Sequence, residues 1–150
     1  MGRSAPPGLL DRFWSSFYPE PVIETRPGEN GVVASAFALV EIDEVARLRQ
    51  DGGPSAFSAG ERAYAEARSD PDRRLAARLA AKRAACRLLG GATEPKDVEV
   101  VRGRYGPPAL RLSERAARRM RALGAHEALV SLTHERRHAA AVVLLLRGEP

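Results

Sequence analysis

An alanine- and arginine-rich segment at about residues 72–89 constrains the fold of this chain more than any other feature. Its apolar residues recur at helical spacing, and it runs directly into Gly90-Gly91, a pair typical of the left-handed stop of a helix. The segment therefore predicts one long helix. Its apolar face comprises Leu75, Leu79, Cys86 and Leu89, and a separate basic row comprises Arg74, Arg78 and Lys82.

Shorter elements surround this helix. Ser58 and Glu61 form a capping-box pattern at the start of an earlier helix, and Ser113 caps a later helix that ends at Gly124. Apolar runs predict strands over residues 32–42, 97–102, 108–112, 128–132 and 139–146, with a Gly-Pro turn between the second and third. These elements predict an α+β fold, with a mostly antiparallel sheet packed against a long helix and shorter helices.

Length, charge and composition restrict the class of protein. With 150 residues, of which 44% are apolar and 29% charged, the chain is expected to form a compact globular domain. The net charge of +5 suits acidic partners, but the arginines are spread over the whole chain without interleaved aromatic residues, so no nucleic-acid partner is expected. No secretory signal and no membrane-spanning stretch is recognisable, which predicts a cytoplasmic protein with no membrane partner. The single cysteine, Cys86, excludes an intramolecular disulfide.

Residues 1–31 form a distinct N-terminal arm before the predicted domain at residues 32–150. The arm is rich in proline and glycine at both ends and holds four of the chain's aromatic residues: Phe13, Trp14, Phe17 and Tyr18. Their spacing predicts one side of a short helix that ends at Pro19. Because such an aromatic face is expected to be buried, the arm either packs on its own domain or docks on another subunit or protein.

The helix and several short pieces occur in an order that resembles a known family. The pieces are residues 40–42 (Val-Glu-Ile), 57–64, 97–100, 106–108 (Gly-Pro-Pro), 123–124 and 130–135. In these pieces, from about residue 32 to residue 146, the chain is similar to the holo-acyl-carrier-protein synthases, which are small 4′-phosphopantetheinyl transferases. The resemblance implies a phosphopantetheinyl-transferase-like fold.

The resemblance also implies phosphoryl-transfer chemistry. Family members move the phosphopantetheine arm of coenzyme A onto a serine of an acyl carrier protein, with a magnesium ion on the pyrophosphate. An aspartate and a glutamate hold this metal in the family, and Ala38 and Arg83 stand at the matching positions here. Neither side chain coordinates a divalent cation, so no metal is expected. Glu44 replaces the arginine with which the family contacts its carrier.

The two charge reversals predict an ion pair. Glu44 stands in the place of an arginine and Arg83 in the place of a glutamate, so the two side chains can pair with each other across the former metal site. Glu41 and Asp43 are not expected to replace the lost ligands. On a strand, side chains alternate, so theirs would point to the face opposite Ala38.

Other functional positions of the family are retained. Arg78 and Lys82 match basic residues of its phosphate-binding helix, Arg87 replaces a lysine, and His134, followed by Glu135, matches a histidine beside the substrates. Arg78, Lys82, Arg87 and His134 are therefore the candidate coenzyme A ligands, as an anion-binding patch without metal. The alternative interpretation is a solvated basic helix face and a hydrogen-bonded histidine at a strand end.

The missing metal ligands favour a catalytically inactive homologue, with no catalytic residue and no cofactor, that acts as a binding or scaffold subunit in carrier-protein-dependent fatty acid or polyketide biosynthesis. The alternative is an active or repurposed 4′-phosphopantetheinyl transferase, which uses coenzyme A with magnesium or with Arg83 in place of the metal. Either reading predicts an acyl carrier protein or another biosynthetic protein as partner. The resemblance further implies a homo-oligomer, as a trimer, or a hetero-oligomer, with the apolar residues 139–146 as a candidate interface.

Overall fold

The computed structural model describes residues 31–51, 55–102 and 106–148, so the aromatic residues of the N-terminal arm lie outside the described residues. The elements are β1 (Val32–Glu41), α2 (Ile42–Gln50), α3 (Ala59–Glu66), α4 (Pro71–Leu89), the 3-10 turn η1 (Pro95–Asp97), β2 (Val98–Arg102), β3 (Pro108–Leu112), α5 (Glu114–Ala122), β4 (Glu127–His134) and β5 (His138–Leu146). Every strand and helix predicted between residues 32 and 146 is present. Among the described helices, none combines the length and apolar composition needed to cross a membrane.

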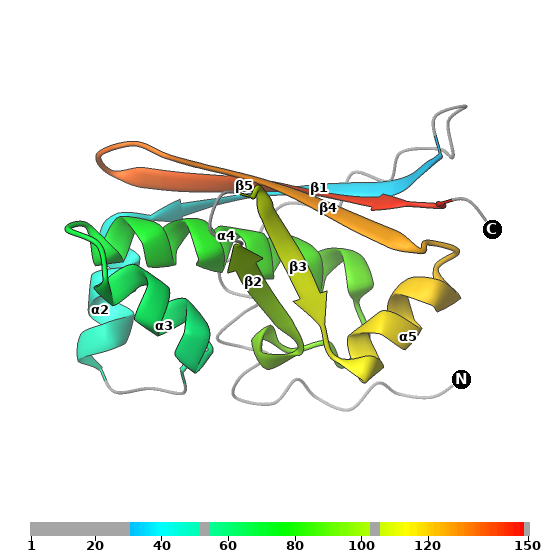
Figure 1. Cartoon of the computed structure of the whole chain (residues 1–150), viewed down its shortest axis with the longest axis horizontal. Helices are drawn as coiled ribbons and strands as arrows, with labels where there is room; N and C mark the ends of the chain where they lie inside the picture. The colour runs from blue at the N-terminus through cyan, green and yellow to red at the C-terminus, as the bar shows by residue number, and fades with distance from the viewer. Residues whose placement is uncertain (1–30, 52–54, 103–105, 149–150) are drawn as a thin grey trace, which may run out of the picture.

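A three-stranded antiparallel sheet in the order β1-β5-β4 forms one layer, and α4 lies along one of its faces (Figure 1). Alternate residues of β1 point toward the helix, because Ala36, Ala38 and Val40 are 5%, 4% and 1% exposed. Helices α2, α3 and α5 lie on the other side of α4 from this sheet, and the β2-β3 hairpin passes beside α4 with β3 in contact with β4 (Figure 1). The predicted α+β architecture is thus confirmed, with α4 at its centre.

Helix α4 is buried on nearly every side, so the alternative interpretation of a solvated basic helix face is wrong for two residues. Arg78 and Lys82 are only 3% and 1% exposed. The sheet covers one side of α4, while α2, α3 and β2 pack on other sides. The many alanines of α4 allow this, because small side chains let several elements approach one helix at once. Helical spacing does not distinguish a row that faces solvent from a row that faces other elements.

Helix α2 is not predicted by the sequence. The first strand is expected to continue to Ile42, but it ends at Glu41, where the chain turns into α2. Glu41 makes no side-chain hydrogen bond at the helix start, so the usual capping signal is missing. Asp43 therefore lies on a helix, and strand alternation is the wrong reason to exclude it as a ligand. The reason holds for Glu41, which is exposed on the strand.

The helix ends follow their sequence signals. Ser113 Oγ accepts a hydrogen bond from the Ala116 backbone N–H at 3.1 Å, which caps α5. Helix α4 ends at Gly90, whose φ of 63° lies in the left-handed region that favours glycine. Asp97 is expected in a strand but ends η1, where its carboxylate accepts the Glu94 backbone N–H at 2.9 Å.

Candidate functional site

Arg83 and Glu44 form the predicted ion pair. The guanidinium of Arg83, in the middle of α4, donates a hydrogen bond to the carboxylate of Glu44, in the first turn of α2. The Arg83 side chain is 2% exposed and that of Glu44 is 13% exposed. The pair is therefore largely removed from water, where its attraction is strong but so is the cost of desolvating both charges.

Ala38 lies on β1, directly opposite Ala141 of β5, and faces the interior. Its methyl group has no lone pair for a metal, and the guanidinium of Arg83 carries only N–H donors. No group of three or more His, Cys, Asp or Glu side chains among the described residues is placed to hold a metal ion. The two positions implied by the family resemblance thus offer no ligand atom to magnesium.

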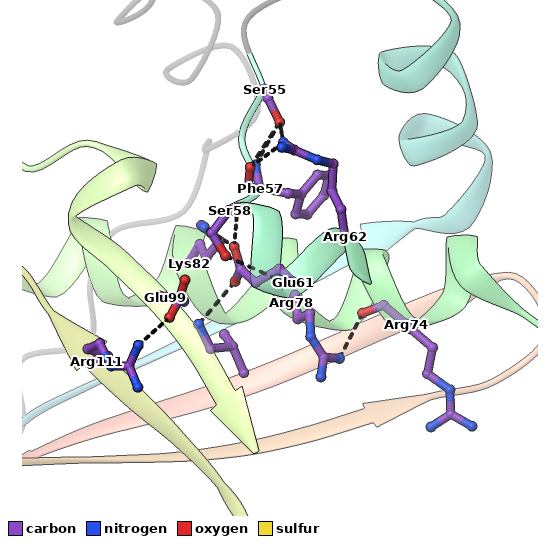
Figure 2. Close-up of polar contacts among 11 residues, drawn as sticks. Ser55, Phe57, Ser58, Glu61, Arg62, Arg74, Arg78, Lys82, Glu99 and Arg111 are labelled. Carbon is purple, nitrogen blue, oxygen red and sulfur yellow. Dashed lines mark hydrogen bonds and ion pairs between the residues drawn. The ribbon is translucent and has the colours of Figure 1, made fainter. Parts of the chain in front are cut away.

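Glu61 of α3 joins three elements through a buried carboxylate (Figure 2). Its Oε1 accepts the Ser58 backbone N–H at 2.8 Å and pairs with the ammonium of Lys82, while its Oε2 accepts the Val100 backbone N–H at 3.0 Å. The side chains of Lys82 and Glu61 are 1% and 0% exposed. Lys82, a predicted cofactor ligand, is therefore occupied inside the fold. The sequence identifies the capping box of Glu61 but gives no signal for its pairing with Lys82.

Arg78, the second predicted ligand on α4, packs against Tyr64. Its guanidinium carbon lies 3.9 Å from the centre of the Tyr64 ring, and Nη1 donates to the Arg74 backbone oxygen at 3.2 Å. The Nε of Arg78 has no hydrogen-bond partner among the described residues. Burial raises the pKa of Tyr64, but Arg102 and Arg78 outweigh it, so the pKa lies below its usual value. The sequence does not reveal this cluster.

Glu135 shapes the turn between β4 and β5. Its carboxylate accepts the backbone N–H groups of Arg137 at 2.9 Å and of His138 at 2.7 Å, and it contacts His138 Nδ1 at 2.9 Å. The backbone hydrogen bond from Arg137 and the contact with His138 lower the pKa of Glu135 to about 2. The neighbouring His134, at the end of β4, is half-buried.

The four candidate coenzyme A ligands do not form one exposed patch. Arg78 and Lys82 are buried, whereas Arg87 and His134 are half-buried. Arg87 donates to the backbone oxygen of Phe37 at 3.4 Å and lies nine residues beyond Arg78 on α4, about 14 Å along the helix axis. The thiol of Cys86 is no candidate nucleophile, because burial raises its pKa to about 12.

Relatives of known name share most of this domain. A holo-[acyl-carrier-protein] synthase from Thermus thermophilus is 44% identical over 119 residues, which cover 76% of this chain and 93% of that protein. The chain belongs to the holo-[acyl-carrier-protein] synthase family. Another member, from Nitratidesulfovibrio vulgaris, is 51% identical over 75 residues, and the match spans 47% of this chain and 60% of that protein's length. No family model matches the chain.

Solved structures of holo-[acyl-carrier-protein] synthases have the same fold. Acyl carrier protein synthase from Mycobacterium tuberculosis is 35% identical with a TM-score of 0.60, over 77% of this chain and 97% of that one. An ACPS–coenzyme A complex from Chronobacterium ammoniagenes is 28% identical with a TM-score of 0.63, at the same coverage of 77% and 97%. The predicted fold of the family is therefore confirmed.

Proposed function

We propose that this chain is a repurposed 4′-phosphopantetheinyl transferase that acts on an acyl carrier protein in fatty acid or polyketide biosynthesis, in the cytoplasm. The observation that carries the proposal is the 44% identity to a holo-[acyl-carrier-protein] synthase over 93% of that protein's length. The name of that relative states the carrier substrate, and a related structure is a complex with coenzyme A. An acyl carrier protein and coenzyme A are therefore the first two substrates to test.

The proposed reaction breaks a phosphoanhydride bond and forms a phosphoester bond. The serine oxygen of the carrier bonds to the phosphorus of the phosphopantetheine arm, the pyrophosphate bond of coenzyme A breaks, and 3′,5′-ADP leaves. The serine proton needs an acceptor. Glu135 is a weak base, because its pKa is lowered to about 2, so we assign this role to His134.

We propose that the transfer does not use the magnesium site of the family. Ala38 offers no ligand atom, and a cation beside Arg83 would meet a positive charge. Two positive unit charges about 4 Å apart repel each other by roughly 1 kcal/mol in water and by roughly 4 kcal/mol near a protein surface. Glu44 already neutralises Arg83, so its carboxylate is not available to a metal. The residues at this site do not fit magnesium.

Coenzyme A binding would rest on few accessible side chains. Arg87 and His134 are half-buried, whereas Arg78 and Lys82 are engaged with Tyr64 and Glu61. We therefore expect binding that is weak, sensitive to salt and independent of magnesium.

A second candidate function is favoured by the Glu44–Arg83 ion pair. A pyrophosphate reaches Arg83 only if Glu44 moves away, and a buried pair that stays intact closes this part of the site. The chain would then be a catalytically inactive binding or scaffold subunit for the carrier protein or for another biosynthetic protein. The first candidate requires that the pair open or that the reaction proceed beside it.

We also propose that the chain works as an oligomer, with a homotrimer as the first arrangement to test. The outer face of the β1-β5-β4 sheet supports this, because no described helix covers it (Figure 1). The largest exposed apolar side chains of the described residues all lie on it: Phe37 (54%), Leu39 (58%), Leu129 (43%) and Val142 (39%). Apolar faces of this kind mark protein contacts.

Labelled coenzyme A and a panel of apo-carrier proteins separate the two candidates. The label on the carrier is measured with magnesium and with a chelator, and carrier binding is measured by titration calorimetry on the same preparation. If the carrier is labelled in the presence of the chelator, the result supports the transferase. If the carrier binds but is not labelled, the result supports the scaffold subunit. Label that strictly requires magnesium contradicts the loss of the metal site. If the carrier is neither bound nor labelled, both candidates are contradicted.

A further inference from the structure

An arginine-lined pocket lies between α5 and the loop that follows α4. Its volume is about 370 Å³, and its lining residues are Ala92, Thr93, Arg115, Arg118, Arg119 and Ala122. Helix α5 carries four arginines and one glutamate within nine residues, which gives it a net charge of +3. The pocket is separate from the Glu44–Arg83 and Glu61–Lys82 pairs, because none of those four residues lines it.

Two of the three arginines are held in place by structural acceptors. Arg119 Nε donates to the backbone oxygen of Leu89 at 2.7 Å, at the end of α4. Arg115 Nη2 pairs with Asp97 Oδ2 at 2.5 Å, and Ser113 Oγ donates to the other oxygen of that carboxylate at 2.8 Å. A guanidinium has several N–H donors in a rigid plane, so each arginine keeps donors beyond the one that fixes it.

The third arginine, Arg118, is held only loosely. Its Nε lies 4.0 Å from the carboxylate of Glu114, and the two side chains are 70% and 74% exposed. Arg121 competes for the same carboxylate at 3.2 Å. An exposed pair of this length contributes little, so Arg118 can turn toward a ligand at small cost.

The charge around the pocket is not cancelled by acids in its lining. Of the nearby carboxylates, Asp97 is 6% exposed and already accepts hydrogen bonds from Arg115, Ser113 and the Glu94 backbone. Glu114 lies on the exposed side of α5, and Glu94 pairs with Lys96 at 3.2 Å. The lining residues comprise three arginines and no carboxylate.

We propose that this pocket binds a phosphate-bearing ligand. Planar guanidinium groups match phosphate oxygens in pairs, and three of them around one pocket suit a multiply charged phosphate better than a single carboxylate. The small side chains of Ala92 and Ala122 leave room for such a group. The phosphate belongs either to coenzyme A or to a separate phosphate compound. The inference goes beyond the proposed transfer, because it holds whether or not the chain is catalytically active.

Inorganic pyrophosphate is the probe, titrated calorimetrically into the full chain at low salt. We expect saturable binding that weakens as sodium chloride is added. Arg118→Gln should weaken it about tenfold, since it removes one charged donor, and Ala122→Glu should weaken it at least as much by adding a negative charge. Arg121→Gln is the matched control: Arg121 is on the same helix, exposed and outside the pocket lining, so the change should be less than about twofold.

Absence of pyrophosphate binding by the folded wild-type chain overturns the proposal. Equal weakening by Arg118→Gln and Arg121→Gln also overturns it, because the effect would then reflect net charge alone. Circular dichroism establishes that each variant is folded. If coenzyme A displaces pyrophosphate, the result supports phosphate binding in the pocket with coenzyme A as the ligand. If pyrophosphate binds and coenzyme A does not displace it, the result supports phosphate binding with a separate phosphate compound as the ligand. Failure of the transfer assay leaves these results unchanged, so the two proposals fail separately.

Discussion

Arg83 of α4 is buried against the carboxylate of Glu44 of α2, and each of the two residues has the opposite charge to the one that the family resemblance implies at its position. The pair links α2 to α4 through two residues that are 39 positions apart in the chain. A buried pair contributes little net stability compared with apolar residues, but either partner left alone is costly. The two substitutions are therefore coupled.

Single substitutions should expose this coupling. We expect Arg83→Glu, which faces two carboxylates toward each other, and Glu44→Arg, which faces two guanidinium groups, each to lower the free energy of unfolding by roughly 3–5 kcal/mol. The double exchange restores opposite charges and should recover much of the loss. Urea unfolding of the wild type, the two single variants and the double variant gives a double-mutant cycle. If the two single losses simply add in the double variant, the ion pair does not contribute to the fold.

Glu61 is predicted to be essential for packing of α3 on α4. Glu61→Ala leaves the buried ammonium of Lys82 and the backbone N–H of Val100 without their acceptor, so we expect a loss of roughly 3–5 kcal/mol. Glu66→Gln, an exposed change on the same helix, is the control and should shift stability by less than about 0.5 kcal/mol. A loss for Glu61→Ala as small as that of the control would show that the carboxylate is not a structural centre.

Asp97 should make the fold sensitive to acid. Burial raises its pKa, but hydrogen bonds from Arg115, from the Glu94 backbone and from Ser113 outweigh burial, so the pKa lies below its usual value. A carboxyl with a depressed folded-state pKa stabilises the fold above its unfolded pKa of about 3.9, and this contribution is lost as the pH falls through the folded value. We expect Asp97→Asn to be less stable than the wild type at neutral pH, with a difference that shrinks below about pH 4. Urea unfolding across this range measures it, and a difference independent of pH would rule out the ionised carboxylate as the cause.

Restoring the carboxylates should restore metal binding. We expect the wild-type melting temperature to be insensitive to magnesium, and the variant Ala38→Asp with Arg83→Glu to gain a magnesium-dependent increase. This double variant should transfer little phosphopantetheine, because Glu44 still presents a negative charge to an acidic carrier, and adding Glu44→Arg should increase transfer. Thermal melts with magnesium and with chelator measure the magnesium-dependent increase in melting temperature. If the double variant already transfers as fast as the triple variant, position 44 does not contact the carrier.

The sequence predicts the long helix, its glycine stop and the capped starts of α3 and α5, because these depend on local backbone chemistry. It also predicts the Glu44–Arg83 pair, since two opposite charge reversals within one site suggest a common cause. Helix α2 is missed because Glu41 provides no side-chain cap. The burial of Lys82 is missed because its partner is 21 residues away and only the packing of α3 on α4 brings the two together.

Transfer of labelled phosphopantetheine from coenzyme A to an apo-acyl carrier protein, in the presence of a metal chelator, is the most direct test of the proposed function. We expect label on the carrier serine, and the amount should not increase when magnesium replaces the chelator. A wild-type chain that is folded and binds the carrier but labels none of the panel would contradict the transferase and leave the scaffold subunit as the function.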